Sequence, residues 1–174
     1  MTENSTNGGG KLNPTATVEG LMPKNSMNGI ATPQIQYCAF EVVDLLVGID
    51  VQLVQEVLRE QDMAFVPLAP SGVRGLINLR GQIVTALDLR SRLGLSPRPT
   101  GVKAMNAVIR HGDEVVSLLV DRTRDVVEPP ADRFEAVPPT VSQRIREMCT
   151  GTYKLEGRLL LILDTERVIQ IEDQ

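Results

Sequence analysis

The sequence has few aromatic residues: among 174 residues there are three Phe, two Tyr and no Trp. Valine, leucine and isoleucine must therefore supply nearly all of the buried surface, and an aliphatic, β-branched composition favours strands. Nucleic-acid-binding domains usually carry a basic surface and aromatic side chains on which bases stack. A net charge of −4 and the lack of interleaved aromatics therefore argue against a nucleic-acid partner.

Residues for catalysis or metal binding are equally scarce. The only His is His111, in the stretch RHGDEV, where we expect an exposed hairpin turn. The two cysteines, Cys38 and Cys149, are far apart and outside any CxxC spacing, so we expect free thiols that serve in packing. No HExxH motif or Asp-rich calcium loop is present. We expect no catalytic residues, no metal and no cofactor.

Long apolar runs are also missing. None approaches the roughly 20 residues that span a bilayer, and the N-terminus has no basic start followed by an apolar stretch. These features predict a cytoplasmic protein. Residues 1–34 are rich in Asn, Gly, Thr, Ser and Pro and show no hydrophobic period, which predicts a flexible N-terminal tail ahead of a folded domain over 35–174.

What the folded part contains is an internal repeat. GIDVQLVQEV (48–57) overlays SLLVDRTRDV (117–126) at an offset of 69, and GLINLRGQIVTALDL (75–89) overlays GTYKLEGRLLLILDT (151–165) at an offset of 76. The second copy therefore holds 76 − 69 = 7 extra residues in its middle, within the stretch from Val126 to Thr150. Two related halves of short strands follow from this pattern.

The repeat predicts a mostly β fold with a few short helices. We expect two small five-stranded barrels, resembling those of Src-homology domains, because closure protects the edges of short aliphatic strands. The first subdomain is expected over about 36–95 and the second over about 102–174, with a boundary in GLSPRPTGVKAM. Strand exchange between the two subdomains is compatible with the repeat.

Several polar and glycine residues are expected to serve the fold alone. Gly81 and Gly157 fit tight hairpin turns, and Asp88 and Asp164 fit helix N-caps. The repeated glycines Gly75 and Gly151 are assigned to turns as well. GLINLRGQ is no phosphate loop, because no Lys-Ser/Thr follows its second glycine.

Arg80 is not explained by turn geometry, since its counterpart in the second copy is Glu156. It is either a solvated turn residue or the ion-pair partner of Glu56, and an arginine suits such pairing because its planar guanidinium can bind a carboxylate through two hydrogen bonds. Beside Glu56, the stripe of Val51, Val54 and Val57 is either core or a docking groove for a partner helix. The pattern leaves both questions open.

These stretches resemble the CheW family of chemotaxis coupling proteins. The resemblance runs from Gln36 to about Ile171 and rests on VGIDVQLVQEVL, VPLAPSGVRGLINLRGQI, DLRSRLG, LLVDRTRDVV and GRLLLILDTERVI. VRGLINLRG is the most specific of them. One departure is Thr85, which stands where proline is common in the family and restores one backbone N–H.

The resemblance implies a non-catalytic adaptor that joins the cytoplasmic tips of methyl-accepting chemotaxis receptors to the regulatory domain of the histidine kinase CheA. It would meet the membrane only through the receptors. The positions that match the receptor-facing surface of the family are Val51, Val54, Glu56, Val57, Arg80 and Val120, with Cys38 beside them. Two alternatives stand next to this reading: an adaptor of a non-flagellar pathway such as twitching motility, and a double-barrel protein that binds a small ligand.

Overall fold

The chain forms short antiparallel hairpins, because aliphatic runs of six or seven residues alternate with turns rich in glycine and charge. The structure is a computed structural model, and it describes residues 34–171; the tail expected over 1–34 lies almost wholly outside the described residues. The strands are β1 (Tyr37–Val42), β2 (Leu45–Asp50), β3 (Val54–Arg59), β4 (Met63–Ala64), β5 (Val73–Leu79), β6 (Gln82–Asp88), β7 (Met105–His111), β8 (Glu114–Val120), β9 (Arg122–Val127), β10 (Phe134–Glu135), β11 (Cys149–Leu155) and β12 (Arg158–Leu163).

The helices are short. They are the 3₁₀ turns η1 (Val51–Leu53) and η2 (Ala131–Arg133) and the α-helices α1 (Leu89–Arg92), α2 (Gln143–Glu147) and α3 (Thr165–Ile169). Helix α2 lies inside the stretch where the second copy of the repeat was expected to hold its extra residues.

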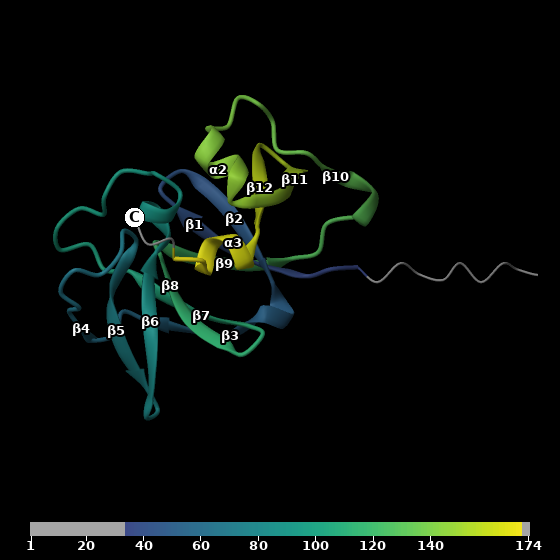
Figure 1. Ribbon diagram of the computed structural model, residues 1–174. Coiled ribbons are helices and arrows are strands. Elements are labelled where there is room, and N and C mark those ends of the chain that lie inside the picture. Colours follow the sequence, from purple (N-terminus) through teal and green to yellow (C-terminus); the bar gives the residue numbers. More distant parts are fainter. Residues whose placement is uncertain (1–33, 172–174) are drawn as a thin grey trace, which may run out of the picture. The chain divides into compact units, whose positions relative to one another are not determined.

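The strands form two six-stranded sheets, which lie on different sides of the molecule (Figure 1). Sheet A has the order β10-β11-β12-β2-β1-β9, and sheet B has the order β3-β7-β8-β6-β5-β4. The mostly β prediction is confirmed. Each sheet has five main strands plus a two-residue strand, β4 or β10, at one edge.

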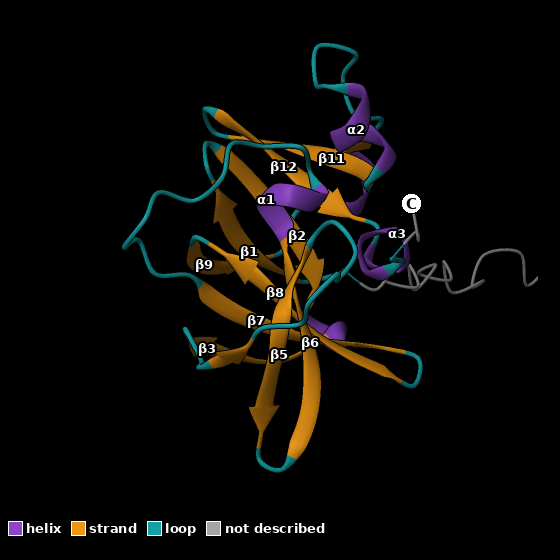
Figure 2. Ribbon diagram, turned by 60° about the vertical axis from the view of Figure 1, so that its left-hand side comes forward, coloured by secondary structure: helices purple, strands orange, loops and turns teal. Residues whose placement is uncertain are grey.

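The sheets do not follow the two halves of the chain. Sheet A combines β1 and β2 from the first half with β9 to β12 from the second, and sheet B combines β3 to β6 with β7 and β8. The subdomains expected over 36–95 and 102–174 therefore do not correspond to the sheets, and the strand exchange that the repeat left open is present. Figure 2 shows the short helices beside the region where the two sheets meet.

The two sheets are related by the repeat, strand for strand. In sheet A, the second strand of the β1–β2 hairpin pairs in parallel with β12 from the other half of the chain. In sheet B, the second strand of the β7–β8 hairpin pairs in parallel with β6 in the same way. The outer edge is β9 in sheet A and β3 in sheet B. The chain thus crosses between sheets twice at equivalent places: from sheet A to sheet B at Val51–Leu53, and back again at Asp121.

Three groups of buried side chains hold this arrangement. The largest draws on both sheets and on all three α-helices, with Phe40, Ile49, Leu118 and Leu161 among its members. A second group lies within sheet A and a third within sheet B. Alternate residues of β1 show the division, since Phe40 and Val42 face the shared core while Tyr37 and Ala39 face the group within sheet A.

Candidate functional site

The first crossing between the sheets carries most of the predicted surface residues. Val51 begins η1, and Val54 and Val57 follow on the edge strand β3. Val54, Val57 and Cys38 of β1 are half-buried and pack against the shared core on one side only. Each of these side chains contacts the core and remains partly accessible, so the alternatives of core and docking stripe both stay open.

Val120 does not belong to this surface. It is the last residue of β8, is 0% exposed and lies in the shared core, so a partner cannot reach it in this structure. Val120 is the counterpart of Val51 in the repeat. Every residue from Val116 to Val120 is nevertheless buried, so both faces of this part of the strand are covered. The expectation that Val120 faces a partner is wrong for this reason.

Glu56 and Arg80 form the expected ion pair. The Arg80 Nη2 atom lies 2.7 Å from Glu56 Oε2; the Arg80 side chain is 82% exposed and that of Glu56 is 23% exposed. Glu56 lies on β3 at one edge of sheet B, and Arg80 lies in the β5–β6 hairpin turn. In a flat sheet the two strands between β3 and β6 would separate them by roughly 14 Å, so the contact indicates that sheet B curls.

The turn that presents Arg80 is tight. Arg80 and Gly81 both have positive φ, 49° and 88°, and the Gly81 N–H donates to Asn78 Oδ1 over 2.8 Å. Two consecutive positive φ values characterise the hairpin turn whose twist matches that of the flanking strands. A left-handed conformation is uncommon for arginine and directs its side chain from the hairpin tip toward β3. In the equivalent turn of the second copy, between β11 and β12, only Gly157 is left-handed, with φ 74°.

Two glycines assigned to turns lie inside strands instead. Gly75 of β5 and Gly151 of β11 each sit at an irregularity of strand pairing. A Cβ atom at Gly151 would collide with the Phe134 ring, and one at Gly75 would collide with the Ala64 carbonyl oxygen. Close packing rather than a turn explains both glycines.

The two aspartates cap helices. Asp88 accepts the N–H of Arg90 at the start of α1, and Asp164 accepts the N–H of Arg167 at the start of α3. These contacts end the strands β6 and β12 in the same way in both copies of the repeat.

The second crossing is charged. Asp121 accepts hydrogen bonds from the Arg90 and Arg98 guanidinium groups and from the Val43 N–H, the last at 2.6 Å. Burial alone would raise the pKa of Asp121, but these hydrogen bonds outweigh it and hold the pKa below its usual value. Arg90 also donates to the carbonyls of Ser96 and Pro97, which fixes the linker between the halves.

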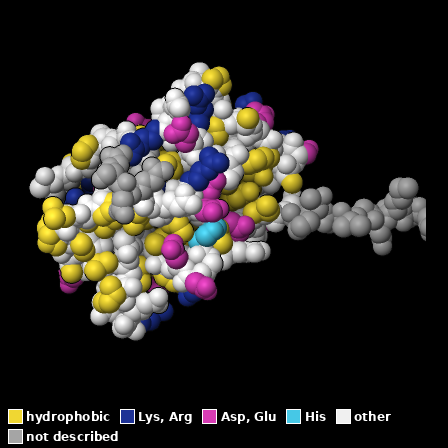
Figure 3. Space-filling view, in the orientation of Figure 1, with side chains coloured by type: hydrophobic (Ala, Val, Ile, Leu, Met, Phe, Trp, Pro, Cys, Tyr) yellow, Lys and Arg dark blue, Asp and Glu magenta, His cyan; other side chains and the backbone are white. Residues whose placement is uncertain are grey.

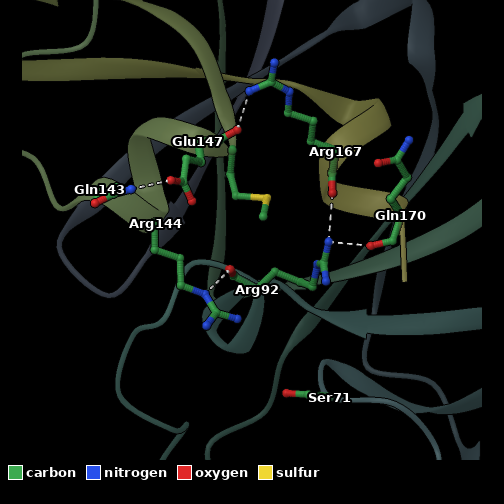
Figure 4. Close-up of a pocket in the computed structure, with 8 residues that line it drawn as sticks. Ser71, Arg92, Gln143, Arg144, Glu147, Arg167 and Gln170 are labelled. Atoms are coloured by element: carbon green, nitrogen blue, oxygen red, sulfur yellow. Dashed lines mark hydrogen bonds between the residues drawn. The ribbon is translucent and has the colours of Figure 1, made fainter. Parts of the chain in front are cut away.

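A pocket of about 720 Å³ lies between the three α-helices (Figure 4). Its arginines each bond to carbonyl oxygens of another helix or its end: Arg92 of α1 to Arg167, Val168 and Gln170, Arg167 of α3 to Glu147, and Arg144 of α2 to Ser91 and Arg92. In Figure 4 the guanidinium groups of Arg144 and Arg167 point in different directions rather than toward one point. The arginines of this pocket therefore join the three helices to one another.

Three further side chains with reactive groups, those of Cys38, Cys149 and His111, are buried or half-buried. Burial, with a smaller contribution from Asp164, raises the pKa of Cys149 to about 12, and burial followed by Asp50 raises that of Cys38. His111 is half-buried at the end of β7, not in the turn, and its Nδ1 lies 3.2 Å from Thr165 Oγ1. Residues 34–171 contain no group of three metal-ligating side chains, and no helix among them is long and apolar enough to cross a membrane.

Sequence reasoning missed the arginine contacts at the second crossing and between the helices. A signal was available, because Arg90, Arg92 and Arg98 follow a strand within an apolar stretch where solvent-facing charge is not expected. Arg90 bonds to Asp121, which is 31 residues away, and Arg92 bonds to backbone carbonyls that are 75 or more residues away. The sequence pattern alone does not reveal contacts over such distances.

Comparison with known proteins agrees with this fold. A sequence model described as a CheW-like domain matches residues 36–173. The chain is 29% identical over 140 residues to the chemotaxis protein CheW of Thermotoga maritima, covering 80% of this chain and 91% of that protein. It is 30% identical over 125 residues to the CheW protein of Bacillus subtilis, covering 72% and 80%. Among solved structures, the scaffolding protein TtCheW from Thermoanaerobacter tengcongensis has the same fold, with a TM-score of 0.71, 22% identity and coverage of 81% and 91%.

Proposed function

Because the chain belongs to the CheW-like domain family, we propose that it is a non-catalytic adaptor that couples methyl-accepting chemotaxis receptors to the histidine kinase CheA. The adaptor works in the cytoplasm and reaches membrane arrays through the receptors. It acts by holding two partners at fixed positions rather than by transforming a substrate.

One observation carries this proposal: the Glu56–Arg80 ion pair is made at the edge strand β3, which also carries the half-buried Val54 and Val57. Val51, Val54 and Val57 offer an apolar strip to a receptor helix, and Cys38 extends it on sheet A. Arg80 is mostly exposed and retains guanidinium N–H groups for a partner carboxylate. An apolar strip with a charged rim is the usual composition of a helix-docking surface.

The kinase contact is tested first by calorimetric titration of this protein into the regulatory domain of CheA from the same cell. Saturable one-to-one binding with a dissociation constant of about a micromolar or tighter is the expected result, since modest contacts gain strength from multivalency in an array. Absence of binding to the cognate domain, with the protein shown to be folded, would contradict the adaptor proposal.

The receptor surface is tested by Arg80→Glu. Two carboxylates would then face each other at β3, and we expect receptor-dependent kinase activation to fall about tenfold or more, while the free energy of unfolding changes by at most about 1 kcal/mol for so exposed a pair. Glu156→Arg, at the equivalent turn of sheet A, is the matched control and should leave activation unchanged. Equal activation in both variants would remove Arg80 from the receptor surface.

The alternative of a small-ligand double barrel is tested by a thermal-shift screen against metabolites. The pocket between the helices and the pocket at Asp121 are lined mainly by charged and polar side chains, whereas small-molecule pockets are mostly apolar. A reproducible shift with a metabolite, together with no effect of Arg80→Glu on kinase activation, would favour the alternative. A response restored only in a twitching-motility strain would assign the adaptor to that pathway.

A further inference from the structure

The repeat gives the molecule two equivalent crossings between its sheets, with opposite chemistry. The first, at Val51–Leu53, is apolar and partly open. The second, at Asp121, has a buried valine before it and Arg122 after it. The backbone also differs, because the 3₁₀ turn η1 joins β2 to β3 at the first crossing, whereas Asp121 alone separates β8 from β9 at the second.

A pocket of about 520 Å³ opens at the second crossing. It lies between the β1–β2 turn, the start of the edge strand β9 and the start of β12, with α1 behind it. Four arginines line it together with three carboxylates: Arg90, Arg122, Arg124 and Arg158 with Glu41, Asp44 and Asp121. The lining therefore has one positive charge in excess, on a chain whose net charge is −4.

The two inner carboxylates are already occupied. Asp121 accepts from Arg90, from Arg98 and from a backbone N–H. Glu41 is shared by two cations, with Arg124 Nη2 at 2.7 Å and Arg158 Nη1 at 3.2 Å from the same oxygen atom. One carboxylate cannot use all the donors of two guanidinium groups, each of which has five N–H groups.

Arg122 has no such partner. Its side chain is exposed and makes no ion pair or hydrogen bond with any of residues 34–171. Arg124 and Arg158 are 47% and 40% exposed, so their spare donors also reach solvent. The third carboxylate, Asp44, is exposed on the turn and would repel an anion there, but the same lining holds three accessible arginines.

The turn beside the pocket is strained. Val43 has φ 57°, a left-handed conformation that β-branched residues avoid, while the equivalent residue of the second copy is Gly112, with φ 60°. The fold itself therefore accepts glycine at this turn, yet this copy places an isopropyl group there, at the pocket wall. Such outliers concentrate at functional surfaces.

The pocket between the three helices provides an internal comparison. Its arginines bond to backbone carbonyls of neighbouring helices and do not point toward one centre (Figure 4). Elsewhere, charges of both signs are interspersed over the face drawn in Figure 3. The pocket at the second crossing differs in that its lining includes Arg122, whose side chain forms no ion pair or hydrogen bond with residues 34–171.

We propose that the pocket at the second crossing docks a carboxylate-bearing peptide segment of a protein partner. The spare donors of Arg122, Arg124 and Arg158 receive the carboxylates, and Val43 and Val102 contact the apolar part of the segment. A peptide suits the site better than a small anion, because the arginines are spread over an open pocket that also includes the half-buried Val43 and the exposed Val102. This surface is separate from the Glu56–Arg80 pair and does not depend on the adaptor proposal.

The test is an NMR titration of the full chain with hexaglutamate as the probe, with hexaglutamine as the uncharged control. We expect saturable shifts of the backbone amides at Val43, Arg122 and Arg124, and affinity that falls as salt is added. Arg122→Gln should weaken binding about fivefold, because it removes one charged contact worth about 1 kcal/mol at an exposed site. The Arg122 side chain is exposed and forms no ion pair or hydrogen bond with residues 34–171, so its replacement should leave the protein folded.

Arg144→Gln, in the pocket between the helices, is the matched control and should leave hexaglutamate affinity unchanged. Equal weakening by Arg122→Gln and Arg144→Gln would show diffuse attraction and overturn the proposal. Shifts of the same size and affinity with inorganic phosphate would overturn the peptide assignment. The absence of any shift at the highest peptide concentration would overturn the site itself.

Discussion

Among the glycines of the described residues, Gly151 leaves the least room for a side chain. It faces the ring of Phe134, which also packs on Tyr153 with ring centres 5.1 Å apart. We expect Gly151→Ala to destabilise the protein by about 1–3 kcal/mol, because the added methyl group displaces the ring. Urea denaturation measures this change.

The Phe134→Ala background isolates the cause. With the ring removed, the same Gly151→Ala substitution should cost much less, and the coupling energy in the double-mutant cycle should be about 1 kcal/mol or more. Independent, additive effects would mean that the glycine is needed for its backbone alone.

At the same scale, sequence reasoning succeeded where the signal is local. The Asp88 and Asp164 caps and the Gly81 turn follow from residues within three positions of each other. The Glu56–Arg80 pair was found because the repeat left Arg80 without a structural reason. Val120 was misplaced because repeat equivalence to Val51 carries no information on whether a strand is covered on one face or on both.

Helices α1, α2 and α3 are too short to be stable on their own, and arginine contacts between them supply the missing partners for their terminal carbonyls. The contacts form a closed cycle, with Arg92 bonding to α3, Arg167 to α2 and Arg144 to α1. This cycle could not be predicted from sequence, since each contact joins different elements and no periodic pattern marks it.

The cycle predicts a graded response to substitution. Arg92→Gln should destabilise the protein by about 2–4 kcal/mol, because Arg92 is buried and the carbonyls of Val168 and Arg167 would lose a charged donor. Arg144→Gln should cost about 1 kcal/mol, since its side chain is exposed at the pocket rim. Hydrogen exchange should show faster opening of α3 in Arg92→Gln than in Arg144→Gln; equal rates would contradict the cycle.

For the whole molecule, the charged second crossing makes stability depend on pH. Hydrogen bonds to the Asp121 carboxylate hold its pKa below the unfolded value of about 3.9. A lowered folded pKa contributes stability that is fully present above the unfolded pKa and is lost as pH falls through the folded pKa. The melting temperature should therefore fall as pH drops below about 4, and less steeply in Asp121→Asn.

Asp132→Asn is the control, because this exposed carboxylate makes no ion pair within residues 34–171. Its pH profile should follow that of the unmodified protein. If the melting temperature of Asp121→Asn falls with pH as steeply as in the unmodified protein and in Asp132→Asn, the loss of stability in acid is due to other carboxylates.

Strand exchange predicts how the molecule responds to division. Fragments 34–101 and 102–171 each contain strands of both sheets and complete neither. We expect each fragment alone to lack the near-ultraviolet circular dichroism and dispersed NMR spectrum of the folded protein, and an equimolar mixture to recover both. A fragment that folds alone would contradict the exchange. The sequence left strand exchange open as one possibility. A repeat shows which strands are equivalent, but it does not show whether a strand pairs within its own copy or with the other copy.

The exchange also governs the order of events during synthesis. The parallel pair of β2 with β12 joins Leu46 to Leu160, residues separated by 160 − 46 = 114 positions. Sheet B cannot be completed until β8 has left the ribosome, and sheet A cannot be completed until β12 has left it. Strand β2 must therefore remain without its parallel partner β12 while more than a hundred residues are translated, and chain closure over such a distance is slow. Until β12 is made, the unpaired edge of β2 is open to incorrect pairing, so synthesis of this protein in the cell requires that this edge be protected.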